Sequence, residues 1–270
     1  MSAAQEQRYE RKYIFHESQS QRIRDYVRAY LVPDEYAVGK PDFSYPIHSI
    51  YFDSDDLFTY WAQVHCEKRR FKLRVRYYDD DPLTPAFVEL KGRYNDCIIK
   101  QRAAVRKLGA AEALSMYYPA AEQLLSPKPR NLIILQRFFR LARTLRARPK
   151  MHVAYKREAW MHPQNNTVRV TMDRQIRGEP VTDLRFTTHM LNEYRPVLDL
   201  YRHYAEQVML ELKYTDHFPH WFTDLVQRFD LIQIGSPKYG RCIETVGVEQ
   251  MSRAGDWNSA TAHAWIQKYF

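Results

Sequence analysis

Basic residues at every second position mark the segment 71–78. Lys72, Arg74 and Arg76 share one face of a β-strand, whereas the apolar side chains between them share the other face. Arg can bind phosphate oxygens with two parallel N–H groups, and Lys binds them as a point charge. Such a row has the chemistry to bind a chain of phosphates, although a solvated sheet face shows the same alternation.

The alternation returns far along the chain. Between residues 165 and 177, Arg169 and Asp173 share a face opposite apolar residues, and the Glu-Leu-Lys of 89–91 recurs at 211–213. If these strands close into a barrel with their charged faces inward, helices must cover the apolar faces. Removing each cation from water costs about several kcal/mol, so confined cations must be paired or meet an anion. Their excess therefore predicts a polyanionic ligand.

Composition supports a globular protein with an anionic partner. The chain has 270 residues, 45% of them hydrophobic, with a net charge of +9 and a pI near 9.3. Its three cysteines, at 66, 97 and 242, form no disulfide framework or zinc motif. The N-terminal residues lack a signal-peptide pattern, and no apolar run is long enough to span a membrane. We expect a cytoplasmic protein, or one held peripherally at a membrane by a partner.

The hydrophobic periodicity predicts an α+β chain without a linker-like break. We expect a single domain over 1–270, with a barrel core at about 8–245 and a C-terminal tail or helix at 248–270. Strands are predicted at 8–15, 47–52, 71–78, 87–91, 98–102, 151–157, 165–177 and 208–214. Helices are predicted from residue 18 or 20 to 31, from about 53 to 64, in one or two pieces within 109–125, and at 131–148 and 219–229, with a loop or short turn at 235–240.

The predicted helix 131–148 has an apolar and a basic side. Its apolar stripe consists of Ile133, Ile134, Phe138 and Leu141. Its basic side, with the residues that follow it, consists of Arg137, Arg140, Arg143, Arg146, Arg148 and Lys150. A solvated helix face explains these cations; the alternatives are a surface that collects an anionic product or one that docks on an anionic membrane.

An ordered set of short motifs resembles one known family. The motifs are Glu10–Tyr13, His48–Asp53 followed by Asp55, Asp56 and Leu57, Lys72–Tyr77, Phe87–Lys91, Tyr155–Ala159, Val168–Asp173, Glu211–Lys213 and Lys238-Tyr239. Together they resemble the VTC domain, the polyphosphate polymerase domain of the vacuolar transporter chaperone, in the triphosphate tunnel metalloenzyme superfamily. The matches run in order from about residue 8 to residue 243, and the order makes the set more specific than any one motif.

The resemblance implies a fold and an activity. The fold would be an eight-stranded antiparallel β-barrel tunnel covered by α-helices. The activity would be transfer of the γ-phosphoryl of ATP to a growing polyphosphate chain with Mn2+ or Mg2+, and Glu211 would bind the metal. The cations that would contact ATP, polyphosphate or pyrophosphate are Lys12, Arg74, Arg76, Lys91, Lys100, Arg157, Arg169 and Lys238. Eukaryotic members act beside membrane-spanning segments, so a membrane-protein partner is also implied.

Three positions depart from the pattern or leave a choice open. Arg8 stands where the wider superfamily has the first Glu of Glu-x-Glu-x-Lys, which disfavours the hydrolytic and cyclase branches. Pro237 stands where a Ser commonly precedes the Lys-Tyr pair, so Ser236 is not taken as a ligand. Glu89 is either a second metal ligand or a partner of Lys91, and the partner role is preferred.

Two other functions fit the same residues. One is a tunnel triphosphatase that hydrolyses inorganic triphosphate or nucleoside triphosphates, and the other is a polyphosphate-binding module without catalysis. We expect no nucleic-acid partner, because the cations alternate on strands and no helix-turn-helix or RRM signature occurs. The chain also has no Gly-x-x-x-x-Gly-Lys-Ser/Thr motif, which excludes a P-loop ATPase.

Overall fold

The computed structural model describes residues 8–94, 97–116, 118–165, 167–196, 206–235 and 237–252. Its strands form one ten-stranded sheet with every pair antiparallel. The path is β10-β1-β9-β8-β7-β3-β4-β5-β6, with β2 beside β7. The strands are β1 (Arg8–His16), β2 (Val32–Pro33), β3 (Ser44–Asp53), β4 (Arg69–Tyr77), β5 (Pro85–Tyr94), β6 (Cys97–Arg106), β7 (Arg148–Met161), β8 (Val168–Pro180), β9 (Gln207–Thr215) and β10 (Ile232–Gln233).

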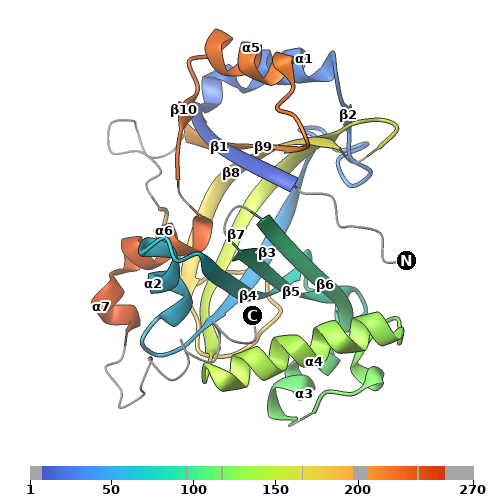
Figure 1. The fold of residues 1–270 in the computed structure, drawn as a ribbon, viewed down its shortest axis with the longest axis vertical. Helices are drawn as coiled ribbons and strands as arrows, with labels where there is room; N and C mark the ends of the chain where they lie inside the picture. The colour runs from blue at the N-terminus through green and yellow to red at the C-terminus, as the bar shows by residue number, and fades with distance from the viewer. Residues whose placement is uncertain are drawn as a thin grey trace.

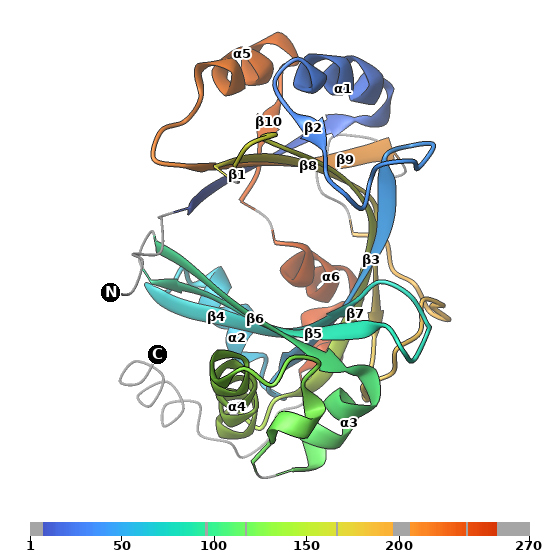
Figure 2. The ribbon, with the colours of Figure 1, turned by 90° about the vertical axis from the view of Figure 1, so that its right-hand side faces the viewer.

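The sheet curls strongly, so that β1 and β6 approach each other across an opening (Figure 2). No ladder joins these two strands among the described residues, so the sheet stops short of the closed eight-stranded barrel that was expected. One reason lies on the outer edge of β1. There β10 pairs with Tyr13 and Ile14, and the amide of Ile234 donates to the carbonyl of Lys12 at 2.9 Å, which occupies the backbone groups that closure would need.

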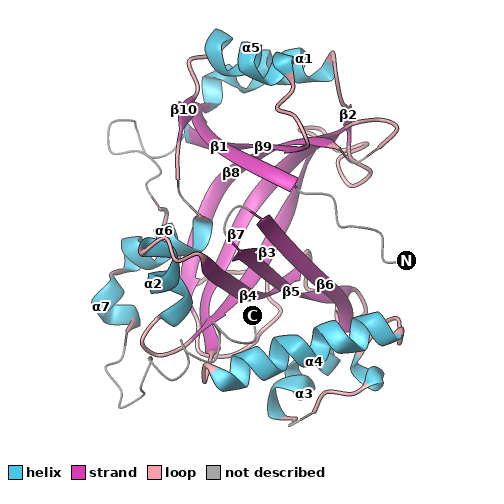
Figure 3. Ribbon diagram, in the orientation of Figure 1, coloured by secondary structure: helices cyan, strands magenta, loops and turns pink. Residues whose placement is uncertain are grey.

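Helices cover the outside of the curved sheet at both ends of the molecule (Figures 1 and 3). The helices are α1 (Ser20–Arg28), α2 (Phe58–Val64), α3 (Lys107–Ser115), α4 (Pro129–Thr144), α5 (His220–Arg228), α6 (Lys238–Val246) and α7 (Val248–Met251), with 3-10 turns at Glu17–Gln19 and Ala121–Gln123. None of the described helices has the length and apolar character needed to cross a membrane.

The alternation read in the sequence explains this covering. The apolar side chains of β4, including Leu73 and Val75, pack with Phe138 of α4 in one core. Val170 and Met172 of β8 pack in a second core with α1 and α5. These two strands therefore bury their apolar faces against helices and turn their charged faces to the concave side, as predicted.

A third core occupies part of the concave side, where α6 lies within the curve of the sheet (Figure 2). Tyr239 of α6 stacks on Tyr51 of β3, with ring centroids 4.9 Å apart. Its hydroxyl donates to Oδ2 of Asp53 at 2.7 Å, and the same buried carboxylate accepts from the backbone amides of Thr59 and Tyr60 in α2. Asp53 thus joins β3, α2 and α6 at one point.

The prediction for the helix 131–148 was wrong in its bounds and in one residue of its apolar stripe. The predicted helix 131–148 is α4, which runs from 129 to 144; Arg146 adopts a left-handed φ of 50°, and Arg148 begins β7. Ile133 is 64% exposed, because the residues that face the sheet follow Ile134 at helical spacing and Ile133 is rotated off that face.

The segment 235–240 is not a simple loop. Lys238 starts α6, and its neighbour Tyr239 is buried. Sequence reasoning missed this helix because Gly235, Pro237 and Gly240 indicate a turn, whereas Pro directly before the first helical turn also suits a helix start. The predicted C-terminal helix after 252 lies outside the described residues.

Packing of α6 on β8 supports a stability prediction. A Cβ atom at Gly178 would lie 2.7 Å from both Cβ and Sγ of Cys242. We expect Gly178→Ala to lower the free energy of unfolding by about 1–3 kcal/mol through overpacking. Gly235→Ala is the matched control, since a Cβ there meets nothing within 4 Å. Urea denaturation measures both, and equal stability of the two variants would contradict this packing.

Candidate functional site

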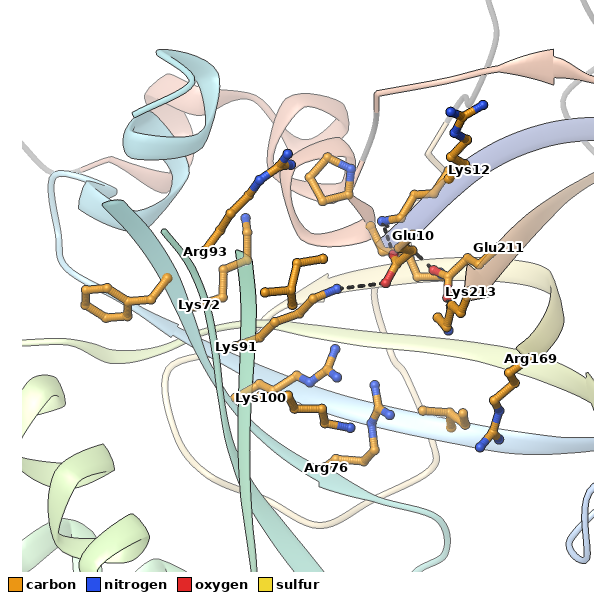
Figure 4. A pocket seen from close by; sticks show the side chains of 18 of the residues that line it. Glu10, Lys12, Lys72, Arg76, Lys91, Arg93, Lys100, Arg169, Glu211 and Lys213 are labelled. Atoms are coloured by element: carbon orange, nitrogen blue, oxygen red, sulfur yellow. Dashed lines mark hydrogen bonds and ion pairs between the residues drawn. The ribbon is translucent and has the colours of Figure 1, made fainter. Parts of the chain in front are cut away.

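The concave face of the sheet encloses a cavity of about 1710 Å³. Among the described residues that line it, Glu10 and Glu211 are the only carboxylates. The cations of the lining are Arg11, Lys12, Arg70, Lys72, Arg74, Arg76, Lys91, Arg93, Lys100, Arg102, Arg130, Arg157, Arg169, Lys213 and Lys238. Every cation predicted to contact phosphate is in this set, and the predicted metal ligand Glu211 also lines the cavity. Figure 4 shows several of them pointing toward the same space.

Strand register brings like charges face to face. Lys91 of β5 stands opposite Lys72 of β4 on one side and opposite Lys100 of β6 on the other. Like charges in directly opposed positions destabilise a sheet. An anion bound between these strands would therefore stabilise the sheet at Lys72, Lys91 and Lys100.

The next row of same-face residues across β4, β5 and β6 contains its own counterion. Glu89 stands between Arg74 and Arg102 in register, and its buried carboxylate accepts from Arg74 Nε at 2.7 Å. Lys100 Nζ and Arg102 Nε lie 3.1 and 3.5 Å from Oε1 of Glu89. Burial alone would raise the pKa of Glu89, but these neighbours hold it well below its usual value.

The preferred pairing of Glu89 with Lys91 is wrong. Lys91 Nζ instead lies 3.2 Å from Oε2 of Glu10, across the opening between β5 and β1 (Figure 4). The physical reason is the curl of the sheet, which brings β1 within reach of β5 and leaves Glu89 to the cations of the neighbouring strands. Glu10 was placed on the first strand from the sequence, but its role as this bridge was not foreseen.

Glu211 is the most heavily paired carboxylate of the lining. Lys213 Nζ lies 2.6 Å, Lys238 Nζ 2.9 Å, Arg157 Nη2 3.3 Å and Lys12 Nζ 3.9 Å from its oxygens. Burial would raise its pKa, but these cations hold the pKa well below the usual range, so the group is ionised. Lys213 was missed as a site residue, although the repeated Glu-x-Lys motif placed it on the same face.

A second buried carboxylate positions two of the predicted cations. Asp173 of β8 accepts from Nε and Nη2 of Arg157, both at 2.7 Å, which is a bidentate contact. Lys238 Nζ lies 2.6 Å from Oδ2 of the same group. Because Lys238 comes from the first turn of α6, Asp173 and Glu211 together hold the start of that helix against the sheet.

Two cations in the cavity have weaker compensation. Arg76 is buried, and its recorded hydrogen bonds go to the hydroxyls of Ser49 and Tyr155 at 3.3 and 3.2 Å. The ammonium of Lys72 is buried without a hydrogen-bond partner among the described residues and lies 4.5 Å from the ring centroid of Tyr239. These are positions where an anionic ligand would supply the missing partner.

Desolvation also changes the protonation of the cavity lysines. The pKa of Lys72 is lowered to about 7, mainly by burial; Asp53 opposes this shift, whereas the nearby Lys12 and Lys91 contribute to it. Burial likewise lowers the pKa of Lys213 to about 8, against the effect of Glu211. Part of the positive charge can therefore be lost near neutral pH and regained when an anion binds.

The chain matches one known protein family over most of its length. The model of the family described as the VTC domain matches residues 7–246. A solved structure of a protein from Bacillus halodurans, provisionally named as an adenylate cyclase, is 14% identical to this chain. The match covers 86% of this chain and 94% of that one, with a TM-score of 0.47. No curated protein matches significantly.

The lysine environment predicts proton-linked anion binding. At pH 8 a lysine with a pKa near 7 is mostly neutral, and a bound polyanion favours its charged form, so binding takes up protons and weakens as the pH rises above 7. We expect Lys72→Met to reduce the uptake on binding inorganic triphosphate by roughly one proton at pH 8. Calorimetry in buffers of different ionisation enthalpy measures it. The exposed Lys128→Met is the control, and an unchanged uptake in Lys72→Met would contradict the assignment.

Proposed function

Because the chain belongs to the VTC domain family, we propose that it is an ATP-dependent polyphosphate polymerase that works in this cavity. In this proposal the γ-phosphoryl of ATP passes to the end of a growing chain, and the curved sheet acts as the wall of a tunnel that holds the chain. One observation carries the proposal: cations from strands distant in the sequence line a single concave surface that has far fewer carboxylates.

The arrangement suits phosphoryl transfer because that reaction depends mainly on charge neutralisation and in-line positioning. The bond between the β- and γ-phosphates breaks, ADP leaves, and a new P–O–P bond forms at the acceptor. The acceptor is a phosphate oxygen that is already ionised near neutral pH, so the transfer needs no general base. The task of the protein is to hold both reactants against their mutual repulsion.

The cations differ in the partners that hold them, and this difference suggests different roles in binding phosphate. Arg74 and Arg157 are held by Glu89 and Asp173, so their guanidinium groups are preorganised toward the cavity. Arg76 is held only loosely by hydroxyls, which leaves its charge for ligand oxygens. Preorganised donors in a confined site stabilise transition-state charge more strongly than donors in water.

The donor set fits a divalent metal that is completed by substrate. Glu211 and Glu10 provide hard carboxylate oxygens on the cavity wall, which suit Mn2+ or Mg2+. The described residues contain no cluster of three or more metal-binding side chains, so phosphate oxygens and water would supply the other ligands. When bound, the metal would neutralise charge on the transferred group. Lys12 lies 3.4 Å from Glu10 and 3.9 Å from Glu211, so it would yield part of these contacts.

Substitution of Arg74 tests the proposal directly. We expect Arg74→Ala to reduce synthesis of acid-labile phosphate polymer from ATP and Mn2+ by roughly 100-fold or more, as for loss of one preorganised donor. The fold should persist, since Glu89 keeps Lys100 and Arg102 as partners. Arg185→Ala, at a side chain that is 79% exposed, is the control.

Gel sizing of the product separates the outcomes of this assay. Long chains from the wild-type protein support the polymerase, whereas orthophosphate as the sole product would show a triphosphatase. Wild-type polymer yield from a well-folded Arg74→Ala protein would remove that residue from the site.

Glu211→Gln tests the metal assignment. The substitution keeps the shape of the side chain and removes the charge, so we expect loss of stimulation by Mn2+ together with most of the activity. Arg157 and Lys238 retain Asp173, so the fold should survive. Titrating Mn2+ in the polymer assay measures the effect, with the half-exposed Glu193→Gln as control. Undiminished stimulation by manganese in Glu211→Gln would show that the metal binds elsewhere.

A further inference from the structure

Part of the cavity wall is formed by a group of tyrosines. Tyr36, Tyr45 and Tyr78 line the same cavity as the basic residues. Tyr36 lies in the turn after β2, Tyr45 at the start of β3, and Tyr78 directly after β4. Lys72, Arg74 and Arg76 of β4 and Tyr78 directly after it therefore follow one another at every second position, about 7 Å apart along an extended chain.

The rings form a connected cluster with an open face. Tyr36 and Tyr45 have centroids 5.9 Å apart at an interplanar angle of 57°, and Tyr45 and Tyr78 are 6.5 Å apart at 55°. Tyr78 meets Phe87 edge to face at 5.9 Å. None of these contacts is a parallel stack, and Tyr36 is 64% exposed. Its aromatic surface is therefore accessible to a planar ligand.

A buried carboxylate holds this cluster in place. Asp34 Oδ2 accepts from the hydroxyl of Tyr45 at 2.8 Å, and Oδ1 accepts from the backbone amide of Ala37 at 3.1 Å. Oδ2 also accepts from Nη2 of Arg169 at 2.7 Å. The turn that carries Tyr36 is thus fixed relative to one of the cations assigned to phosphate.

A second cation borders the cluster on its other side. Arg102 donates from Nη2 to the hydroxyl of Tyr78 at 3.2 Å, and its guanidinium lies 3.5 Å from the ring centroid of Phe87. Nε of the same residue lies 3.5 Å from Glu89 in the adjacent layer. Aromatic surface and phosphate-binding charge are therefore contiguous, as a nucleotide requires.

Another tyrosine pair in the lining does not offer such a surface. Tyr9 and Tyr214 stack on each other with centroids 5.4 Å apart at 21°. Tyr214 also meets Phe218 edge to face at 5.1 Å and belongs to the core beneath α5. These ring faces already pack on each other and on the core.

We propose that Tyr36 and Tyr78 form the subsite for the base of the nucleoside triphosphate. The inference rests on the proposed function and deepens it, because it states where in the cavity the base binds and along which residues the phosphates extend. The base stacks at the tyrosine end, and the phosphates extend past Arg76 toward Arg70 and Arg93, which pair in register at the opposite end. Recognition by ring faces tolerates every base, so ATP and GTP are accepted with similar affinity.

Calorimetric binding of ATP and of inorganic triphosphate tests the subsite. We expect the wild-type protein to bind ATP roughly 5- to 100-fold more tightly than triphosphate, which is the range of one stacked base. Tyr36→Ala combined with Tyr78→Ala should remove this preference and leave triphosphate affinity unchanged. Tyr36→Phe should retain the preference, and Tyr30→Ala, in the turn after α1 and outside the cavity lining, is the control for loss of an exposed tyrosine.

The two ligands separate the possible failures. Equal affinity of the wild-type protein for ATP and triphosphate, with polymer still formed, would overturn the base subsite and leave the proposed function intact. An equal loss of both affinities in the tyrosine variants would show that the turn only positions Arg169, which also overturns the subsite. Failure of both ligands to bind the wild-type protein would overturn the proposed function and the subsite together.

Discussion

Confinement of positive charge is the constraint on which the rest of the structure depends. The concave face of one sheet collects Lys and Arg from β1, β4, β5, β6, β7, β8 and β9, and like charges stand opposite each other in the layer of Lys91. Withdrawing such groups from water costs about several kcal/mol each, so the fold must supply counterions or leave positions for a ligand. Both solutions occur in different layers of the same cavity.

Buried carboxylates supply the internal counterions and also set geometry. Glu89, Asp173 and Glu211 each neutralise more than one cation, and Asp34 aligns Arg169. The shared contacts restrict the rotamers of the arginines before any ligand arrives. In contrast, the ammonium of Lys72 is buried over an aromatic ring, where desolvation lowers its pKa to about 7. The cavity therefore combines preorganised charge with charge that responds to a bound anion.

The curl of the sheet leaves an opening into the cavity between β1 and β6 and places different kinds of side chain along the cavity wall. Because β10 occupies part of the free edge of β1, the Lys91–Glu10 ion pair connects β5 to β1 across the gap, and no backbone ladder joins β1 to β6 among the described residues. The core around α6 occupies part of the concave side, and that helix also brings Lys238 to the two central carboxylates. The tyrosine cluster lies at the C-terminal end of the β4 row, where Tyr45 belongs to this core and Tyr78 packs against it. A linear substrate would therefore meet aromatic rings at the tyrosine cluster and cations along the rest of the β4 row.

Local pattern in the sequence determined which residues form the strands and which side of each strand is charged, because the side-chain period of a strand is independent of its neighbours. It thereby identified the cations at 74, 76, 157 and 169 that the structure places in one cavity. Only the tertiary structure decided that Glu89 pairs with Arg74 and that Lys91 pairs with Glu10. It also decided that the sheet stays open and that Tyr36 joins Tyr78. These contacts depend on register and curvature, which arise from packing between segments far apart in the chain.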